Sequence, residues 1–304
     1  MRICSLLPSA TEILYTLGLG DDIVAISHEC DFPPAAREKP AGMRCRIEPS
    51  RMTSEEINRA VGDCMQRGES LYELDVPLLT TLRPDLIVTQ ELCDVCALDT
   101  KHVTAALGSL PGRPAVVSLH PHTITEVFAD MREIGRMTMR VDEASGLIAS
   151  LERRIANVRE RVAGRPRPRV ACIEWFSPLM ACGHWVPEQV DAAGGVEVLS
   201  GPGQPSRTIA WDDVVAARPE VVVLLPCGLP IAQARRELAG LTSRPGWGAL
   251  PAVANRRVFL VDGPAYFNRS GPRLVDGIEL LADLLHPSPN RRPWPAEAVE
   301  AVAP

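Results

Sequence analysis

Short apolar segments alternate with amphipathic ones through the first 120 or so residues of the chain. Residues 2–7 and 23–27 are short apolar runs, and residues 9–12 (SATE) between them have the spacing of a helix-capping box. Further apolar runs follow at 85–90 and 115–119. Apolar strands that alternate with helical segments are typical of βα units and a parallel sheet.

A helical pattern replaces the strand pattern in the middle of the chain. Apolar positions recur there at steps of three and four as far as Val162, with Thr138 as one weak position. The stripe predicts one amphipathic helix over residues 123–164. At 1.5 Å per residue such a helix is roughly 60 Å long, more than one small lobe can cover. We therefore expect a strut between two lobes, which Gly135 or Gly146 could interrupt.

The strand pattern returns after the strut and partly repeats the first half. Apolar runs occur at 170–174, 196–199, 221–225 and 258–261. Residues 83–88 (RPDLIV) and 218–223 (RPEVVV) match each other, and a cysteine follows each. The sequence therefore predicts an α/β protein of two Rossmann-like lobes with parallel sheets, joined by one long α-helix.

These patterns divide the chain into four parts. We expect an N-terminal lobe over 1–122, the connecting helix over 123–164 and a C-terminal lobe over 165–286. The remaining residues, 287–304, are rich in proline and arginine and are expected to form a loose tail.

Composition excludes several classes of protein. The 304 residues are 46% hydrophobic and 23% charged, which is typical of a globular protein, and no apolar run is long enough to span a membrane. The net charge of −6, without a basic reading motif, argues against nucleic-acid binding. The phosphate-binding, dinucleotide-binding and nucleophile-elbow motifs are missing, so no enzyme class is indicated.

The cysteine count and the first residues bear on the compartment. Nine cysteines are an odd number, and a chain of this size does not need disulfides. The apolar run at 2–7 is too short for a signal peptide. We expect a cytoplasmic protein with reduced thiols, although a misassigned start codon would hide a leader.

Candidate ligand-binding residues follow the predicted strands. Ligands of open α/β sheets bind outside the carboxyl ends of the strands. Aromatic side chains gather at such ends, where they could stack on a large flat ligand or fill the hinge as core. The candidates are Pro8, Ser9, His28, Glu29, Trp175, Phe176, His184, Trp185, Tyr266, Phe267, Asn268 and Arg269.

A second group of candidates could hold a metal. Residues 93–96 (CDVC) have a spacing at which both thiolates reach one zinc ion or iron–sulfur cluster, but also the spacing of a redox pair or of buried structural cysteines. The full candidate set is His28, Cys30, Cys93, Cys96 and Cys227. His120 and His122 could also bind a metal, although a hinge role suits their place before the strut better. Cys4, Cys64 and Cys172 are expected to be inert core.

The opening of the chain resembles a known family. Residues 5–14 (SLLPSATEIL), then 17–20 (LGLG), resemble the cobalamin and iron-siderophore binding proteins, which belong to the helical-backbone class of periplasmic binding proteins. The RP motifs at 83–88 and 218–223 fit the same pattern, and the resemblance spans about residues 1–286. Within the family, the chain is similar to a leaderless subgroup commonly labelled cobalamin-binding.

The resemblance implies a fold and a function. It implies two lobes of low mobility, with a corrinoid or another metal chelate bound in the cleft between them and stacked on Trp175 or Phe176 and on Tyr266 and Phe267. In the importers an acidic residue on each lobe docks to an ABC permease, and Asp75 and Asp212 are the nearest matches. Fold does not fix function, however.

Three hypotheses therefore stay open. The first is a cytoplasmic carrier or sensor of a corrinoid or related metal chelate, with no turnover. The second is a cytoplasmic metalloprotein, or an enzyme, whose cysteine and histidine set holds zinc or an iron–sulfur cluster. The third is an exported importer subunit that delivers its ligand to a permease. The first is favoured, and it is compatible with cysteines that coordinate the metal of the ligand.

Overall fold

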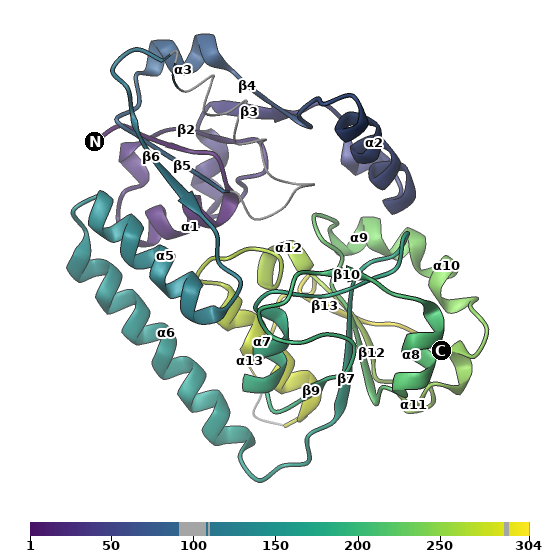
Figure 1. Ribbon diagram of the computed structural model, residues 1–304. Helices are drawn as coiled ribbons and strands as arrows, with labels where there is room; N and C mark the ends of the chain where they lie inside the picture. The colour runs from purple at the N-terminus through teal and green to yellow at the C-terminus, as the bar shows by residue number, and fades with distance from the viewer. Residues whose placement is uncertain (91–107, 109, 289–291, 304) are drawn as a thin grey trace. The chain divides into compact units, whose positions relative to one another are not determined.

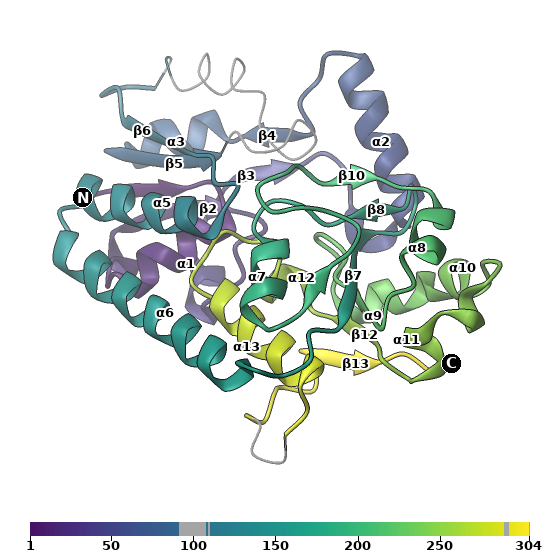
Figure 2. The same ribbon diagram turned by 60° about the horizontal axis from the view of Figure 1, so that its bottom comes forward.

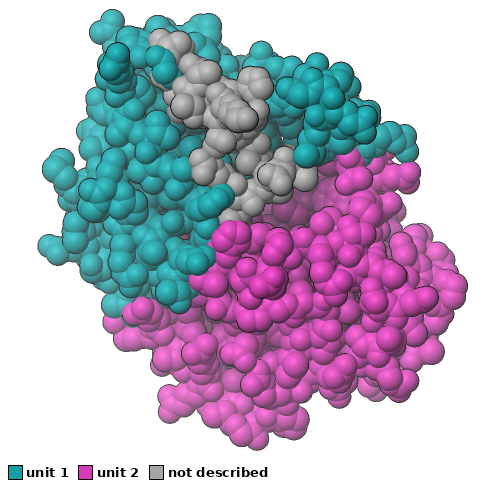
Figure 3. All heavy atoms as spheres, in the orientation of Figure 1, with its two compact units in different colours: residues 1–49, 59–121, 125–150 teal, residues 50–58, 122–124, 151–304 magenta. Residues whose placement is uncertain are grey.

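The computed structural model describes residues 1–90, 108, 110–288 and 292–303 (Figure 1). These residues form two compact units, coloured teal and magenta in Figure 3. Unit 1 comprises Met1–Pro49, Arg59–Pro121 and Thr125–Ser150. Unit 2 comprises Ser50–Asn58, His122–Ile124 and Leu151–Pro304. The two α/β units confirm the fold class predicted from the sequence.

Unit 1 is built on a six-stranded sheet of order β4-β3-β2-β1-β5-β6 (Figure 1). Only β4 runs antiparallel, beside β3. All three residues of the central strand β1 are buried, as both faces of a parallel sheet require. The strands are β1 (Ile3–Ser5), β2 (Ile23–Ser27), β3 (Ala41–Cys45), β4 (Tyr72–Leu74), β5 (Leu86–Gln90) and β6 (Ala115–Leu119).

The helices of unit 1 start at clear sequence signals. The helix α1 (Pro8–Thr16) has its proline in the first turn, where a missing N–H costs nothing. The helix α3 (Val76–Leu82) is capped by Asp75, whose carboxylate accepts the N–H of Leu78 at 2.9 Å. The helix α2 (Ser54–Gln66) begins in unit 2 and continues in unit 1 from Arg59.

Unit 2 holds a seven-stranded sheet of order β10-β8-β7-β11-β12-β13, with β9 also paired to β7. The strands β7, β9, β11 and β12 run parallel to one another. The strands β8, β10 and β13 each run antiparallel to a neighbouring strand. The bounds are β7 (Arg169–Trp175), β8 (Met180–Ala181), β9 (Val196–Glu197), β10 (Arg207–Thr208), β11 (Val221–Leu224), β12 (Val258–Val261) and β13 (Val299–Ala301).

Short helices connect these strands. Of them, α7 and α13 pack side by side, as Figures 1 and 2 show. The bounds are α7 (Val186–Ala192), α8 (Trp211–Ala217), α9 (Ile231–Ala234), α10 (Leu238–Thr242), α11 (Pro251–Ala254), α12 (Gly263–Tyr266) and α13 (Leu274–Leu285). Among the described residues, no helix combines the length and the apolar character needed to cross a membrane.

The predicted single helix over 123–164 is wrong, because the structure forms two helices, α5 (Ile124–Met137) and α6 (Val141–Val162). The break falls at Thr138, the weak apolar position, and Met139 has a left-handed φ of 58°. A Cβ at Gly135 would lie 2.5 Å from the Cβ of Ala144, so this glycine lets α6 fold back closely on α5.

The expectation of a loose tail is also wrong for part of it. Residues Val299–Ala301 form β13, which pairs antiparallel with β12. Before it, the indole N–H of Trp294 donates to Asp283 of α13 at 3.0 Å, and Ala298 is fully buried. The proline-rich composition concealed a short edge strand, a position that tolerates irregular neighbours.

Candidate ligand-binding site

In unit 1, the predicted ligand residues lie beside β1 and β2. Pro8 begins α1, and Ser9 is fully buried within the same helix. His28 follows β2 with its side chain 28% exposed, and its ring centroid lies 5.9 Å from that of Tyr72. Glu29 is exposed and its carboxylate lies 3.9 Å from the His28 ring. His28 and Glu29 are exposed, Pro8 is partly buried, and Ser9 is fully buried.

In unit 2, three of the predicted aromatic residues are internal. Phe176 belongs to the main core of the unit, and Phe267 is fully buried. Trp185 is 3% exposed and its indole N–H donates to the carbonyl of Phe267 at 2.8 Å. Packing accounts for these three side chains, so we leave them out of the proposed site.

The other predicted aromatics are only partly buried. Trp175 ends β7, packs against the core and donates its indole N–H to the carbonyl of Ser177 at 3.0 Å. Tyr266 contacts Trp294 edge to face, with ring centroids 5.9 Å apart. Burial raises the pKa of the Tyr266 phenol, so this hydroxyl stays protonated and able to donate at neutral pH.

Asn268 and Arg269 follow α12, at the carboxyl end of β12. The amide of Asn268 donates to the carbonyl of Leu225 at 3.3 Å, which joins the ends of β11 and β12. Its Oδ1 is buried and accepts no hydrogen bond from the described residues. Arg269 is half-buried beside it. A buried acceptor of this kind is suited to a ligand donor or an ordered water.

Two histidines from distant parts of the chain meet in unit 2. The Nδ1 atoms of His122 and His184 lie 3.2 Å apart, and their ring centroids are separated by 5.3 Å. Both residues are partly buried, and the His184 ring also lies 5.8 Å from that of Trp185. Two ring nitrogens at this separation either form an N–H···N hydrogen bond or can both coordinate one metal ion.

Backbone contacts fix the position of His184. Its N–H donates to Gln204 at 2.6 Å, and its carbonyl accepts the N–H of Gly203 at 2.9 Å. The φ angle of His184 is 54°, in the left-handed region that few residues other than glycine adopt. Strained backbone of this kind is found disproportionately at functional sites.

A second set of contacts brings His122 to this place. The N–H of Ile124, the first residue of α5, donates to the Glu188 carboxylate in the first turn of α7 at 2.6 Å. The segment His122–Ile124 thus belongs to unit 2, while the rest of α5 belongs to unit 1. The sequence interpretation of His122 as a hinge residue missed this pairing, although the spacing with His120 was visible.

Burial lowers the pKa of His184 below its ordinary value, and the neighbouring His122 adds to the shift. His184 is therefore a neutral imidazole at pH 7, and neutral imidazole nitrogen is a common ligand of zinc, iron and cobalt. His184 thus has a backbone fixed by hydrogen bonds, a partly desolvated ring and a ring nitrogen that can bind a metal. Of the predicted ligand residues, His184 has the chemistry best suited to a metal centre.

Three residues of the predicted metal set, His28, Cys30 and Cys227, lie within the described part of the chain. Cys30 is buried and accepts a hydrogen bond from the Thr11 hydroxyl at 3.1 Å, and Cys227 is partly buried after β11. Neither these two nor His28 belongs to a described cluster of three metal-ligating atoms. Cys93 and Cys96 lie outside the described residues, so their role stays a prediction.

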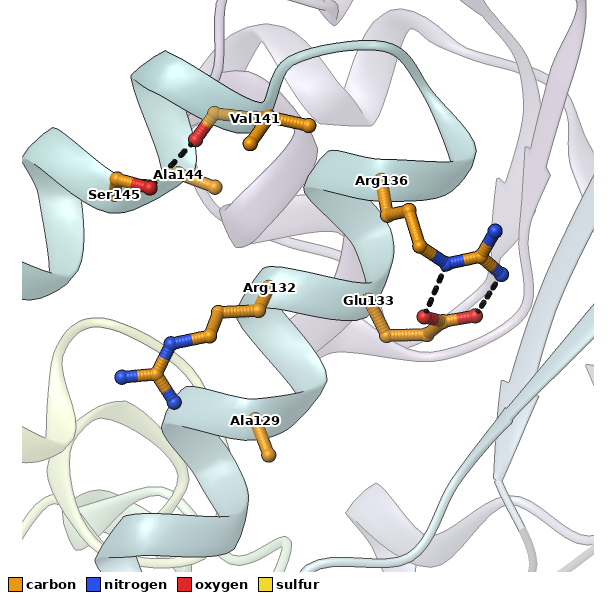
Figure 4. A pocket seen from close by; sticks show the side chains of 7 residues that line it. All are labelled: Ala129, Arg132, Glu133, Arg136, Val141, Ala144 and Ser145. Carbon is orange, nitrogen blue, oxygen red and sulfur yellow. Dashed lines mark hydrogen bonds and ion pairs between the residues drawn. The ribbon is translucent and has the colours of Figure 1, made fainter.

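A hollow between α5 and α6 is a further feature of unit 1 (Figure 4). It is lined by Ala129, Arg132, Glu133, Arg136, Val141, Ala144 and Ser145. Arg136 donates two hydrogen bonds to Glu133, at 2.6 and 2.8 Å, and Ser145 donates to the carbonyl of Val141. The Arg136–Glu133 pair lies on the exposed helix surface, so we do not assign the hollow a ligand.

Comparison with known proteins defines the class first. The model of the periplasmic binding protein family matches residues 3–265, and the chain belongs to this family. The vitamin B12-binding protein of Vibrio cholerae is 23% identical over 287 residues, which cover 93% of this chain and 88% of that protein. An uncharacterised ABC transporter substrate-binding lipoprotein of Bacillus subtilis is 24% identical over 289 residues, 94% of this chain and 80% of that protein.

Solved structures agree on the fold. The periplasmic vitamin B12-binding protein of Vibrio cholerae superposes with a TM-score of 0.67 at 21% identity, covering 93% of this chain and 96% of its own. A periplasmic heme-binding protein of Pseudomonas aeruginosa gives a TM-score of 0.73 at 18% identity, with coverages of 98% and 96%. At these sequence identities the structural similarity establishes the fold and not the ligand.

Proposed function

We propose that this protein binds a corrinoid or another metal chelate such as heme, and that His184 coordinates the metal of that ligand. The observation that carries the proposal is the His122–His184 pair, with Nδ1 atoms 3.2 Å apart in a partly buried position. Membership of the periplasmic binding protein family supports a small-molecule ligand. Relatives named for vitamin B12 and neighbours named for heme make a planar metal chelate the leading class.

The remaining groups of unit 2 suit the rest of such a ligand. Trp175 and Tyr266 offer partly exposed rings for stacking on a flat macrocycle. The Tyr266 hydroxyl and Arg269 offer donors for amide or carboxylate substituents at the edge of the macrocycle.

Calorimetric titration with aquacobalamin and with hemin tests the proposal, because both chelates have an exchangeable axial position. Wild-type protein should bind at least one of them with a one-to-one stoichiometry. His184→Asn should weaken that binding by at least about 10-fold, because the variant removes the coordinating nitrogen itself and not an outer-shell partner. Asparagine tolerates a positive φ, so this variant removes the imidazole while keeping the backbone.

A matched control comes from the same segment as His122. His120 is exposed, and His120→Ala removes an imidazole two residues away from the pair. Its affinity should equal that of wild type. Failure of both chelates to bind, or an affinity of His184→Asn equal to wild type, would contradict the proposal.

We also propose that the protein delivers its ligand to an ABC permease. The Bacillus subtilis relative is named for such a transporter. Asp212 is exposed in the first turn of α8 and open to a partner, whereas the Asp75 carboxylate caps α3. Asp212→Arg should therefore weaken co-purification with a permease more than Asp212→Asn does. Equal recovery of the permease with both variants would count against this contact.

Two predictions from the sequence are open to simple tests. A cytoplasmic location stays a prediction, and fractionation of cells that produce the native gene decides it. The metalloprotein hypothesis based on Cys93 and Cys96 also stays a prediction. Cys93→Ser/Cys96→Ser should reduce the zinc or iron content of the purified protein if these thiols bind a metal.

A further inference from the structure

Three metal-ligating side chains meet in the sheet of unit 2, on residues that have no place in the proposed chelate site. The sulfur atoms of Cys172 and Cys182 and a carboxylate oxygen of Glu197 all lie within 4.8 Å of one another. Both cysteines are fully buried, and Glu197 is partly buried as a residue. Two thiols and a carboxylate are a donor set that suits zinc.

Strand pairing brings the three residues together. Ile173 of β7 lies opposite Ala181 of the antiparallel β8, so Cys182 falls opposite Cys172. The N–H of Cys182 donates to the carbonyl of Cys172 at 3.1 Å. Because Cys172 lies in β7 and Cys182 directly follows β8, the backbone holds their sulfur atoms near each other.

Glu197 comes close to the two cysteines from a third strand. It belongs to β9, which pairs with the start of β7 and places Glu197 opposite Val170. Its carboxylate accepts the N–H of Cys172 at 3.1 Å and that of Leu199 at 2.8 Å. These bonds orient the carboxylate, and an oxygen that accepts an N–H keeps a second lone pair for a metal.

We propose that Cys172, Cys182 and Glu197 bind a divalent zinc-class metal ion in the interior of unit 2. Two thiolates and one carboxylate supply three ligands. Ser200, whose hydroxyl oxygen lies 3.4 Å from the Cys182 sulfur, or a water molecule completes the four that tetrahedral zinc takes. Binding releases the protons of the two thiols to solvent.

The site has the character of a structural metal centre. The ligands come from β7, the residue directly after β8, β9 and the segment after β9, and the chain continues from Cys182 through Gly183 to His184. A metal there would fix the part of the sheet from which the chain continues to His184. Because the cysteines are fully buried, the ion enters while the chain folds, and loading requires metal during expression or refolding.

Cobalt serves as the probe, because thiolate-bound Co²⁺ has a charge-transfer absorption that oxygen-bound Co²⁺ lacks. Wild-type protein refolded with reductant and Co²⁺ should hold one ion per chain and show this band. Cys172→Ser/Cys182→Ser should lose the band. Glu197→Gln should keep the thiolates but lower the affinity by more than about 100-fold, beyond what changes outside the ligand shell cause.

Matched variants assign the band to this site. Cys4→Ala removes another fully buried thiol, in β1 of unit 1, and should keep the band. Cys93→Ser/Cys96→Ser should keep it as well. Loss of the band in Cys93→Ser/Cys96→Ser, together with its retention in Cys172→Ser/Cys182→Ser, would overturn the proposal, as would a wild-type protein without the band.

A second measurement needs no change in the buried pair, in case that double variant does not fold. Zinc X-ray absorption of the Cys93→Ser/Cys96→Ser protein should show sulfur neighbours at about 2.3 Å. A coordination shell of oxygen and nitrogen alone would overturn the proposal. Neither result depends on chelate binding, so the metal site and the proposed function can fail separately.

Discussion

At the scale of single residues, the histidine pair depends on the close approach of two backbone segments. His184 lies between Gly183 and the buried Trp185, and it hydrogen-bonds through its backbone to the loop around Gln204. A Cβ at Gly183 would lie 2.6 Å from the Gln204 carbonyl oxygen and would also meet the backbone N of Ser206. Only glycine allows this approach, and the approach sets where the imidazole lies.

Gly183→Ala should therefore destabilise the protein by about 1–3 kcal/mol, the usual cost of overpacking a tight site. Thermal unfolding followed by circular dichroism measures the effect. Gly62→Ala is the control, because Gly62 lies in α2 and a Cβ added there would meet no atom within 4 Å. It should be neutral or slightly stabilising. Equal melting temperatures for the two variants would refute the packing argument.

Asp130 of α5 gives a prediction on pH. Burial, followed by the neighbouring charge of Glu126, raises the pKa of its carboxyl group to about 7, and its Oδ2 has no hydrogen-bond partner among the described residues. A pKa raised in the folded state favours folding at low pH, and that contribution is lost as the pH rises from about 4 through 7.

Asp130→Asn should consequently gain more stability over wild type at pH 8 than at pH 5. Chemical denaturation at both pH values measures the difference. Glu152→Gln, which changes an exposed carboxylate on α6, should shift the stability equally at the two pH values. An Asp130→Asn protein that loses stability at pH 8 would show that the carboxylate is solvated or paired.

Residue types were predicted better than residue environments. The sequence indicated His184 as a ligand residue, but it could not show that His122, 62 positions away, lies beside it. It also grouped Phe176, Trp185 and Phe267 with the site because they follow strands, whereas all three are buried. An aromatic residue after a strand fits a ligand site and a core equally well, and only packing separates the two.

At the scale of elements, the long buried strands were predictable and the short ones were not. Runs such as residues 221–225 are continuous and apolar, and they became central parallel strands such as β11. β8 and β10 have two residues each, too few for a periodicity. Because β8 was not predicted, the sequence did not indicate that Cys182 lies opposite Cys172.

Packing of α6 on α13 gives a prediction at this scale. Arg161 of α6 forms an ion pair of 3.0 Å with Asp283 of α13, whose side chain is only 4% exposed and also accepts from Trp294. Removing a charged partner leaves a buried carboxylate partly unsatisfied. Arg161→Met should therefore cost about 1–3 kcal/mol.

A control lies two residues earlier on the same helix. Arg159 forms an exposed ion pair of 3.9 Å with Asp191. Arg159→Met should change the stability by less than about 0.5 kcal/mol, because exposed pairs contribute little. Urea denaturation of both variants at pH 7 makes the comparison. A cost for Arg161→Met as small as that for Arg159→Met would show that Asp283 does not need its partner.

At the scale of the whole molecule, the internal repeat was the strongest guide. The RP motifs at 83–88 and 218–223 lead into β5 and β11, a strand beside the first strand of each unit's sheet. In both places the arginine takes a left-handed φ, 45° at Arg83 and 44° at Arg218. The match of short motifs thus reflected a real structural repeat, and it supported two α/β units from the sequence alone.

Function follows less directly from the whole molecule. The family and its two-unit fold agree with a binding protein. The fold accommodates several ligands, however, and a few side chains determine which ligand binds. The histidine pair is the feature that favours a metal centre over an organic molecule of the same size. The proposed function therefore depends most on whether His184 reaches the metal of the ligand.

Visible absorption spectroscopy of aquacobalamin and hemin, each mixed with the protein, addresses that question most directly. Replacement of an axial water by imidazole shifts the absorption bands of either chelate. We predict a shift with wild-type protein that His184→Asn lacks. We also predict that the shift is lost at acid pH, below the ordinary imidazole range, because burial lowers the pKa of His184. An identical shift with His184→Asn, or binding of both chelates without any shift, would contradict coordination by His184.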